Sequence, residues 1–218
     1  MLDRKFRLPR IWSNKILEKY SHRFTGEIIN ISGWKDEDKE GRKYSEYFSN
    51  ASSYTISNFK GERGLSGLNN EVFLDLESDM IKNYKNRFDV CFNHTTLEHI
   101  YNFQKAFDNI CLMSRDIVIL VLPFAQMVHE TDSFGDYWRF TPTAINRMFH
   151  ENKMGILLSA YNNNCNSGLY TITIASKKPD KWKNIISFRE NENILGYRIG
   201  LRVHQRIKTF FKRIAKYF

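Results

Sequence analysis

Short apolar segments alternate with helix-like segments along this chain, and this alternation limits its fold more than any other feature. The strongest apolar run is Ile117–Ala125, which is far shorter than the roughly 20 residues that a membrane-spanning helix needs. Two segments, Thr95–Ser114 and Thr141–Lys153, carry apolar residues at helical spacing, and the second opens with a Thr-Pro pair typical of a helix start. Strands that alternate with helices favour an α/β fold with a doubly wound, mostly parallel sheet. The predicted strands are Gly26–Gly33, Ser52–Phe59, Glu71–Leu76, Arg87–His94, Asp116–Pro123, 155–162 and 168–178.

The order of these segments predicts three parts. We expect an N-terminal helical segment over residues 1–25, with Ser13 as its cap, an α/β domain over 26–180, and a C-terminal extension over 181–218. The last two strands have little chain between them, which predicts an antiparallel finish to a sheet of mostly seven strands. In such a sheet, ligands bind beyond the carboxyl ends of the strands.

The C-terminal extension carries most of the net positive charge of the chain. The formal net charge is +9, and residues 198–218 hold seven Lys or Arg residues and no acid. Their apolar neighbours follow helical spacing, which is typical of a basic amphipathic helix at an anionic membrane. Docking on the chain's own domain or on a protein partner remains an equal alternative. The rest of the chain is nearly neutral, which argues against nucleic acid as a partner.

Cysteine and histidine spacing indicates neither disulfides nor a metal. The three cysteines are widely spaced without a CxxC pair, so we expect a reduced, cytoplasmic setting, with peripheral contact to the inner membrane through residues 198–218. His94, His99 and His129 match no metal-binding motif, so no metal site is predicted.

Two stretches resemble class I S-adenosylmethionine-dependent methyltransferases. The first, FDVCFNHTTLEHIYNFQKAFDNI, is a strand followed by a helix, and the second, VLPFAQMVHETDSFGDYWRFTP, is a proline-ended strand followed by a His and a Asp-Tyr-Trp-Arg-Phe-Thr-Pro run. The resemblance covers roughly residues 24–178, and the second stretch is similar to a subgroup found in surface-polysaccharide biosynthesis. It implies a Rossmann-like fold, S-adenosylmethionine as cofactor, and a sugar or glycan as acceptor.

The resemblance also assigns cofactor contacts by position. It places the loop after the first strand beside the methionine part of the cofactor, where Trp34 and Asp36 stand among positions that are usually glycines and an acid. Asn58 stands where an acid usually binds the ribose, and Asp75 stands near the adenine amine. The predicted cofactor-binding residues are Asn30, Ser32, Gly33, Asn58, Asp75, Leu76, Asn93 and His94.

The loop after the fifth strand is the predicted acceptor side. A methyl transfer to a hydroxyl needs a general base, and His129 suits that role, oriented by Asp132 or Asp136. Tyr137 and Arg139 are the predicted substrate-binding residues. The alternative is a structural loop in which Arg139 pairs with Asp136 and the aromatic rings pack. Glu98 and His99 are neighbours on a predicted helix and point in different directions, so one of them can face the cofactor cleft. The alternative for Glu98 is an acid that caps the first helical turn.

The glycine-poor cofactor loop leaves the function open between two classes. The first is methyl transfer to a sugar or glycan. The second is a catalytically degenerate, methyltransferase-like protein that acts as a binding or scaffold partner. An enzyme of the same fold that uses another donor is a third reading, and nucleic-acid methylation is disfavoured by the charge.

Overall fold

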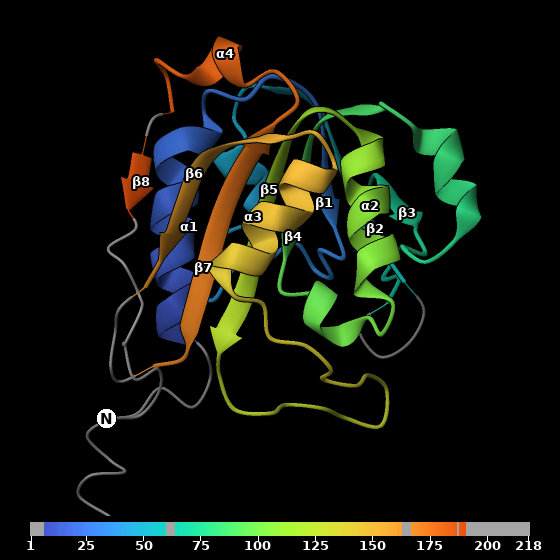
Figure 1. Ribbon diagram of the computed structural model, residues 1–218. Coiled ribbons are helices and arrows are strands. Elements are labelled where there is room, and N and C mark those ends of the chain that lie inside the picture. The colour runs from blue at the N-terminus through green and yellow to red at the C-terminus, as the bar shows by residue number, and fades with distance from the viewer. Residues whose placement is uncertain (1–6, 60–63, 163–166, 187, 191–218) are drawn as a thin grey trace, which may run out of the picture.

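An eight-stranded sheet in the order β3-β2-β1-β4-β5-β7-β6-β8 forms the centre of the molecule (Figure 1). The computed structural model describes residues 7–59, 64–162, 167–186 and 188–190. The strands are β1 (Gly26–Ile31), β2 (Ala51–Asn58), β3 (Glu71–Phe73), β4 (Phe88–His94), β5 (Ser114–Ala125), β6 (Gly155–Tyr161), β7 (Leu169–Ser176) and β8 (Phe188–Glu190). The helices are α1 (Arg7–Ser21), α2 (Phe103–Met113), α3 (Pro142–Glu151) and α4 (Pro179–Trp182), with 3-10 turns η1 (Tyr44–Tyr47), η2 (Asp79–Tyr84) and η3 (Leu97–His99).

The strand directions confirm the predicted doubly wound sheet. Strands β1 to β5 pair in parallel, and β7 runs antiparallel to both β5 and β6. Seven strands therefore have the order 3-2-1-4-5-7-6, with the antiparallel finish that the late strands predicted. The eighth, β8, is a short edge strand parallel to β6 that the sequence pattern did not reveal.

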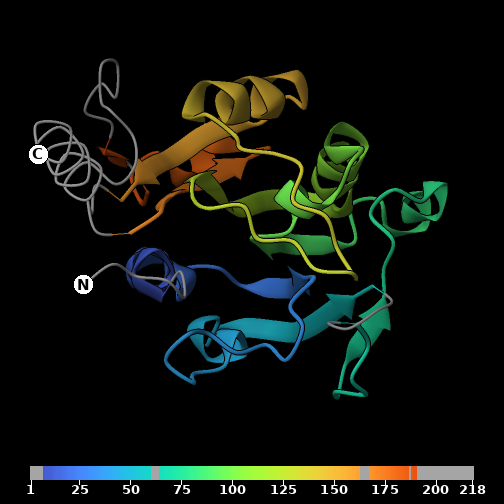
Figure 2. The ribbon, with the colours of Figure 1, turned by 90° about the horizontal axis from the view of Figure 1, so that it is seen from below.

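Helices cover both faces of the sheet, as Figure 2 shows, with α2 and α3 on one face and α1 on the other. On the first face, Phe107 and Phe149 are fully buried in one core cluster and their rings pack 4.9 Å apart. On the second, Leu17 of α1 packs with Phe24 and Phe92 in another cluster. Burial on both faces explains why the central strands are apolar throughout rather than alternating.

Two helix boundaries differ from the sequence prediction. The predicted helix Thr95–Ser114 is split into η3 and α2, because Ile100 takes an extended conformation after η3 and α2 begins only after an Asn102 cap. Ser13 does not cap a helix: α1 begins at Arg7, and Ser13 lies buried inside it, with its hydroxyl donating to the Arg10 carbonyl at 3.0 Å.

One prediction concerns a part of the chain outside the described residues. The predicted basic helix at residues 198–218 lies outside the described residues. Among the helices of the described ranges, none has both the length and the apolar character needed to cross a bilayer.

Candidate functional site

A pocket of about 400 Å³ opens beyond the carboxyl ends of β1, β2 and β4. Ligand pockets in proteins commonly have 300 to 1,000 Å³, roughly the size range of cofactor sites. Parallel strands place their carboxyl ends at one edge of the sheet, so residues from distant parts of the chain meet there. The predicted site residues that line the pocket are Asn30, Ser32, Gly33, Asn58, Asp75, Leu76, His94 and Tyr137.

Three residues other than glycine take left-handed backbone conformations in the loop after β1. Ser32, Trp34 and Asp36 have φ values of 57°, 48° and 58°. Such values are uncommon for residues with a side chain and persist where the surroundings impose them. Gly33 is needed for space, because a Cβ atom there would lie 2.6 Å from Nδ2 of Asn30.

Asp36 is a buried anchor for this loop. Its carboxylate accepts hydrogen bonds from Nδ2 of Asn30 at 2.8 Å, from the Tyr54 hydroxyl at 2.8 Å and from the Ser45 backbone N–H at 3.0 Å. Desolvation, with Asp36 beside it, raises the pKa of Tyr54 well above its usual value, so the hydroxyl stays a donor. Asn30 therefore lines the pocket while its amide is committed to Asp36.

The Asn58 side chain hydrogen-bonds the backbone of the same loop. Its Oδ1 accepts from the Trp34 N–H at 2.7 Å, and its Nδ2 donates to the Trp34 carbonyl at 3.0 Å and to Glu71. Both amide hydrogens are thus used inside the protein. The carboxylates that do line the pocket belong to Glu37, Asp75 and Glu77. Sequence patterns did not single out Glu37 or Glu77.

Two polar residues, Asn93 and His94, lie at the end of β4. Asn93 is fully buried and donates from Nδ2 to the Ile31 carbonyl at 3.0 Å, so it supports the sheet and is not among the pocket-lining residues. His94 lines the pocket, with Nε2 3.2 Å from the Ser13 hydroxyl, and desolvation lowers its pKa well below the usual value. Arg10 of α1 also lines the pocket and donates to the Thr95 hydroxyl at 2.8 Å. Only the tertiary structure brings Arg10 to this position.

Two histidines meet on the acceptor side. The His99 ring lines the pocket, and its Nδ1 lies 2.6 Å from the Gly135 carbonyl. The His129 ring is 4.8 Å from the His99 ring, and its Nδ1 lies 3.1 Å from Oδ2 of Asp136. Desolvation lowers the pKa of both imidazoles. Asp136 is therefore the acid that orients His129, while Asp132 is exposed at the surface of the same loop.

The Asp-Tyr-Trp-Arg-Phe run largely builds structure. Arg139 donates to both carboxylate oxygens of Asp136 at 2.6 Å. This is the ion pair expected if the loop is structural and Arg139 does not bind substrate. The Trp138 and Phe140 rings pack against Phe103 at 4.9 and 5.1 Å. Tyr137 differs, because it is 51% exposed and faces the pocket.

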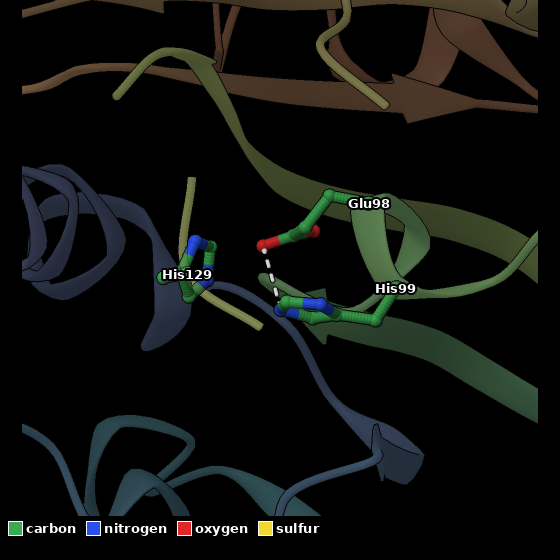
Figure 3. Close-up of side chains that lie close together, drawn as sticks. All are labelled: Glu98, His99 and His129. Atoms are coloured by element: carbon green, nitrogen blue, oxygen red, sulfur yellow. Dashed lines mark ion pairs between the residues drawn. The ribbon is translucent and has the colours of Figure 1, made fainter. Parts of the chain in front are cut away.

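Glu98 is buried rather than capping a helix, contrary to the sequence interpretation. Its side chain is fully buried, and neither carboxylate oxygen has a hydrogen-bond partner among the described residues. Oε1 lies 3.7 Å from Nε2 of His99. The dashed line in Figure 3 marks this contact. Burial raises the pKa of Glu98 to about 8.

Comparison with known proteins places the fold. No protein-family model matches the chain, and neither does any curated protein sequence. The structure of the trans-methyltransferase CalH in complex with SAH matches with a TM-score of 0.52 at 11% identity, over 74% of this chain and 54% of that chain. A Listeria monocytogenes protein assigned as an S-adenosylmethionine-dependent methyltransferase matches with a TM-score of 0.50 at 9% identity, over 78% of this chain and 97% of that chain.

The chain has the fold of S-adenosylmethionine-dependent methyltransferases. The structural matches establish the methyltransferase fold. Sequence identities this low do not establish the reaction, which depends on the residues of the site. The pocket carries three carboxylates, which can accept hydrogen bonds from hydroxyl and amino groups of a ligand. It departs from the expected pattern at Asn58, whose amide serves Trp34.

Proposed function

We propose that this chain transfers a methyl group from S-adenosylmethionine to a hydroxyl of a sugar or glycan in surface-polysaccharide biosynthesis. The observation that supports this most is the pocket of about 400 Å³ at the carboxyl ends of the strands in a methyltransferase fold. When bound, the cofactor supplies a methyl group on an electrophilic sulfonium. The sugar acceptor and the polysaccharide setting rest on the sequence resemblance.

The pocket residues divide into two groups for this reaction. Asp75, Leu76 and Glu77, which follow β3, would hold the adenosine part, and Ser32 and Gly33 would lie along the methionine part. The short approach between Gly33 and Asn30 leaves the loop no room for a larger side chain at that position. Binding the cofactor is therefore the task of the loops after β1 and β3.

The acceptor side supplies the proton chemistry. A hydroxyl that gains a methyl group loses a proton, and a general base within hydrogen-bond reach accelerates that step. We propose His129 as the base, with Asp136 holding its Nδ1. Tyr137 lines the acceptor side of the pocket, and Arg139, which is paired with Asp136 outside the pocket lining, is proposed to bind the acceptor beside it. His99 lies between His129 and the pocket, so the acceptor must reach past or displace its ring.

Calorimetric titration with S-adenosylmethionine and S-adenosylhomocysteine tests the first half of the proposal. We expect a Kd of micromolar order for both ligands. Asp75→Ala should weaken binding at least tenfold, whereas Asp180→Ala on the exposed start of α4 should leave it unchanged. No heat of binding at millimolar ligand with folded protein would refute cofactor use.

A second function is favoured by one observation. The Asn58 amide is used by Trp34, and Trp34 itself lines the pocket, so the second strand offers no free carboxylate for a ribose. A methyltransferase-like protein without cofactor, acting as a binding or scaffold partner, or an enzyme with another donor, would have such a pocket. The same titration separates these from methyl transfer, because both predict that S-adenosylmethionine does not bind.

Contact with the inner-membrane surface is a separate proposal that rests on sequence alone. Residues 198–218 carry seven basic residues and no acid. Each base near an anionic bilayer contributes about 1 kcal/mol to binding. The full chain should sediment with vesicles of anionic phospholipid and the chain without residues 198–218 should not. Equal sedimentation of both would refute the proposal.

A further inference from the structure

Three side chains with metal-ligating atoms meet beside the pocket. Glu98 and His99 come from η3, and His129 comes from the loop after β5 (Figure 3). One ligand atom from each lies within 4.8 Å of the others. Their spacing along the chain matches no metal motif, and only the fold brings His129 to the other two.

We propose that Glu98, His99 and His129 bind a divalent transition metal ion of the zinc class. Two imidazoles and one carboxylate are the protein ligands of a common class of three-ligand zinc site, which keeps one coordination position open. The proposal does not rest on methyl transfer, because it concerns ion binding alone.

Both imidazoles are oriented as metal ligands usually are. A ligating histidine normally donates its other ring N–H to a carbonyl or carboxylate, which fixes the ring and its tautomer. Nδ1 of His99 lies 2.6 Å from the Gly135 carbonyl, and Nδ1 of His129 lies 3.1 Å from Oδ2 of Asp136. The Gln126 amide nitrogen lies beside the His129 ring, 3.1 Å from Nδ1 and 3.5 Å from Nε2. With Nδ1 of His99 donating to the Gly135 carbonyl and Nδ1 of His129 donating to Asp136, Nε2 of each ring is assigned to the ion. At Nε2 of His129 the ion takes the place of the Gln126 amide.

Glu98 provides the independent sign of a missing partner. Its carboxylate is fully buried, and neither oxygen accepts a hydrogen bond from the described residues. A buried carboxylate is normally paired or bound to a metal. The nearby guanidinium groups bond elsewhere, since Arg139 donates to Asp136 and Arg10 donates to Thr95. A divalent cation between Glu98 and the two imidazoles would supply the missing partner.

The geometry requires only a small closure. Zinc–nitrogen and zinc–oxygen bonds of about 2.0–2.1 Å in a tetrahedral site place ligand atoms about 3.3 Å apart. Oε1 of Glu98 and Nε2 of His99 are already 3.7 Å apart. The three ligand atoms lie within 4.8 Å of one another, and His129 lies in a segment without helix or strand, so a small shift of that segment with Asp136 can close the rest.

The ligand set also predicts selectivity among ions. Mg²⁺ and Ca²⁺ prefer all-oxygen coordination, whereas imidazole suits zinc-class ions. A metal at His129 also excludes this ring as a general base, because its Nε2 lone pair would be used by the ion. The two roles of His129 are therefore separable by metal removal.

The test is metal binding by the untagged full chain after chelator treatment. We expect Zn²⁺ to raise the melting temperature while Mg²⁺ does not, and Co²⁺ to give the visible absorption of a low-coordinate site. Glu98→Gln and His129→Gln should abolish both signals, and Asp136→Asn should weaken Zn²⁺ binding about tenfold through the His129 tautomer. His150→Gln, at the exposed end of α3, should change neither signal.

Folding of the variants does not obscure the result. Glu98→Gln removes a buried carboxylate whose oxygens accept no hydrogen bond from the described residues, so the metal-free variant should melt no lower than the metal-free parent. The proposal would be overturned if Zn²⁺ did not change the melting temperature of the parent protein. It would also be overturned if Zn²⁺ raised the melting temperature of folded Glu98→Gln and His129→Gln as much as that of the parent. Neither outcome would bear on cofactor binding, which the calorimetric titration tests separately.

Discussion

The side chain of Asn58 hydrogen-bonds the backbone of Trp34 on both sides. Its Oδ1 accepts from the Trp34 N–H at 2.7 Å, and its Nδ2 donates to the Trp34 carbonyl at 3.0 Å. Trp34 has a left-handed φ of 48°, which a tryptophan adopts only when its surroundings impose it. One buried amide at the end of β2 thus holds a turn for which this fold commonly uses glycine.

Removing this amide should weaken both the fold and the pocket. Asn58→Ala leaves the Trp34 N–H and carbonyl without their partner, so we expect a loss of about 1–3 kcal/mol in the free energy of unfolding. Urea denaturation measures the loss, with Ser53→Ala on the exposed part of β2 as a control that changes stability by less than about 0.5 kcal/mol. Equal midpoints for the two variants would show that the amide does not hold the loop.

Trp34 itself lines the pocket and is 41% exposed, so it can contact a ligand directly. If its ring forms part of the ligand surface, Trp34→Ala should weaken S-adenosylhomocysteine binding about fivefold, because an aromatic contact contributes about 0.5–1.5 kcal/mol. Calorimetry measures the change. Binding that appears only after this substitution would show instead that the indole blocks the pocket.

Glu71 makes part of the stability dependent on pH. Desolvation acts to raise its pKa, but hydrogen bonds from Asn58 and from the backbone N–H groups of Leu68 and Ser66 outweigh it, so the pKa lies below 4.5. A carboxyl group with a lowered folded-state pKa stabilises the fold above its unfolded pKa and loses that effect as the pH falls through the folded value. Glu71→Gln should therefore destabilise the protein at pH 7 and differ little from the parent well below pH 4.5.

Urea midpoints across this pH range measure the difference between Glu71→Gln and its parent. Glu130→Gln, an exposed position in the loop after β5, is the matched control and should track the parent at every pH. A Glu71→Gln effect that stays constant from neutral to acidic pH would contradict the assigned hydrogen bonds.

Trp138 tests the structural reading of the Asp-Tyr-Trp-Arg-Phe run. Its Nε1 donates to the carbonyls of Ile100 and Tyr101, both at 3.1 Å, and its ring packs against Phe103. Trp138→Phe removes these bonds and part of the packing, so thermal unfolding should show a loss of about 1–3 kcal/mol. Tyr137→Phe, on the pocket side, should leave stability within about 0.5 kcal/mol. The reverse order would mean that Tyr137, not Trp138, stabilises the loop.

Much of the sheet was predictable because strand and helix signals are local. The apolar run Ile117–Ala125 lies within the buried β5, and the Thr-Pro pair opens α3 with the Thr141 side chain accepting from the Ala144 N–H. Alternation of such segments led to the parallel sheet and its antiparallel finish. The edge strand β8 and the break between η3 and α2 were missed, because short strands and single turns have too little periodicity to be recognised.

The sequence by itself determined the fold class and the edge of the sheet where the pocket lies, because hydrophobic periodicity and chain order are enough for both. The tertiary structure decided which side chains meet there. Arg10 comes from a helix that is far from β4 in the sequence, and it reaches Thr95 at the end of β4. The Asn58 amide hydrogen-bonds the Trp34 backbone, and Glu98 is buried against His99 with His129 beside it. Such contacts depend on how distant segments pack, and no local pattern encodes them.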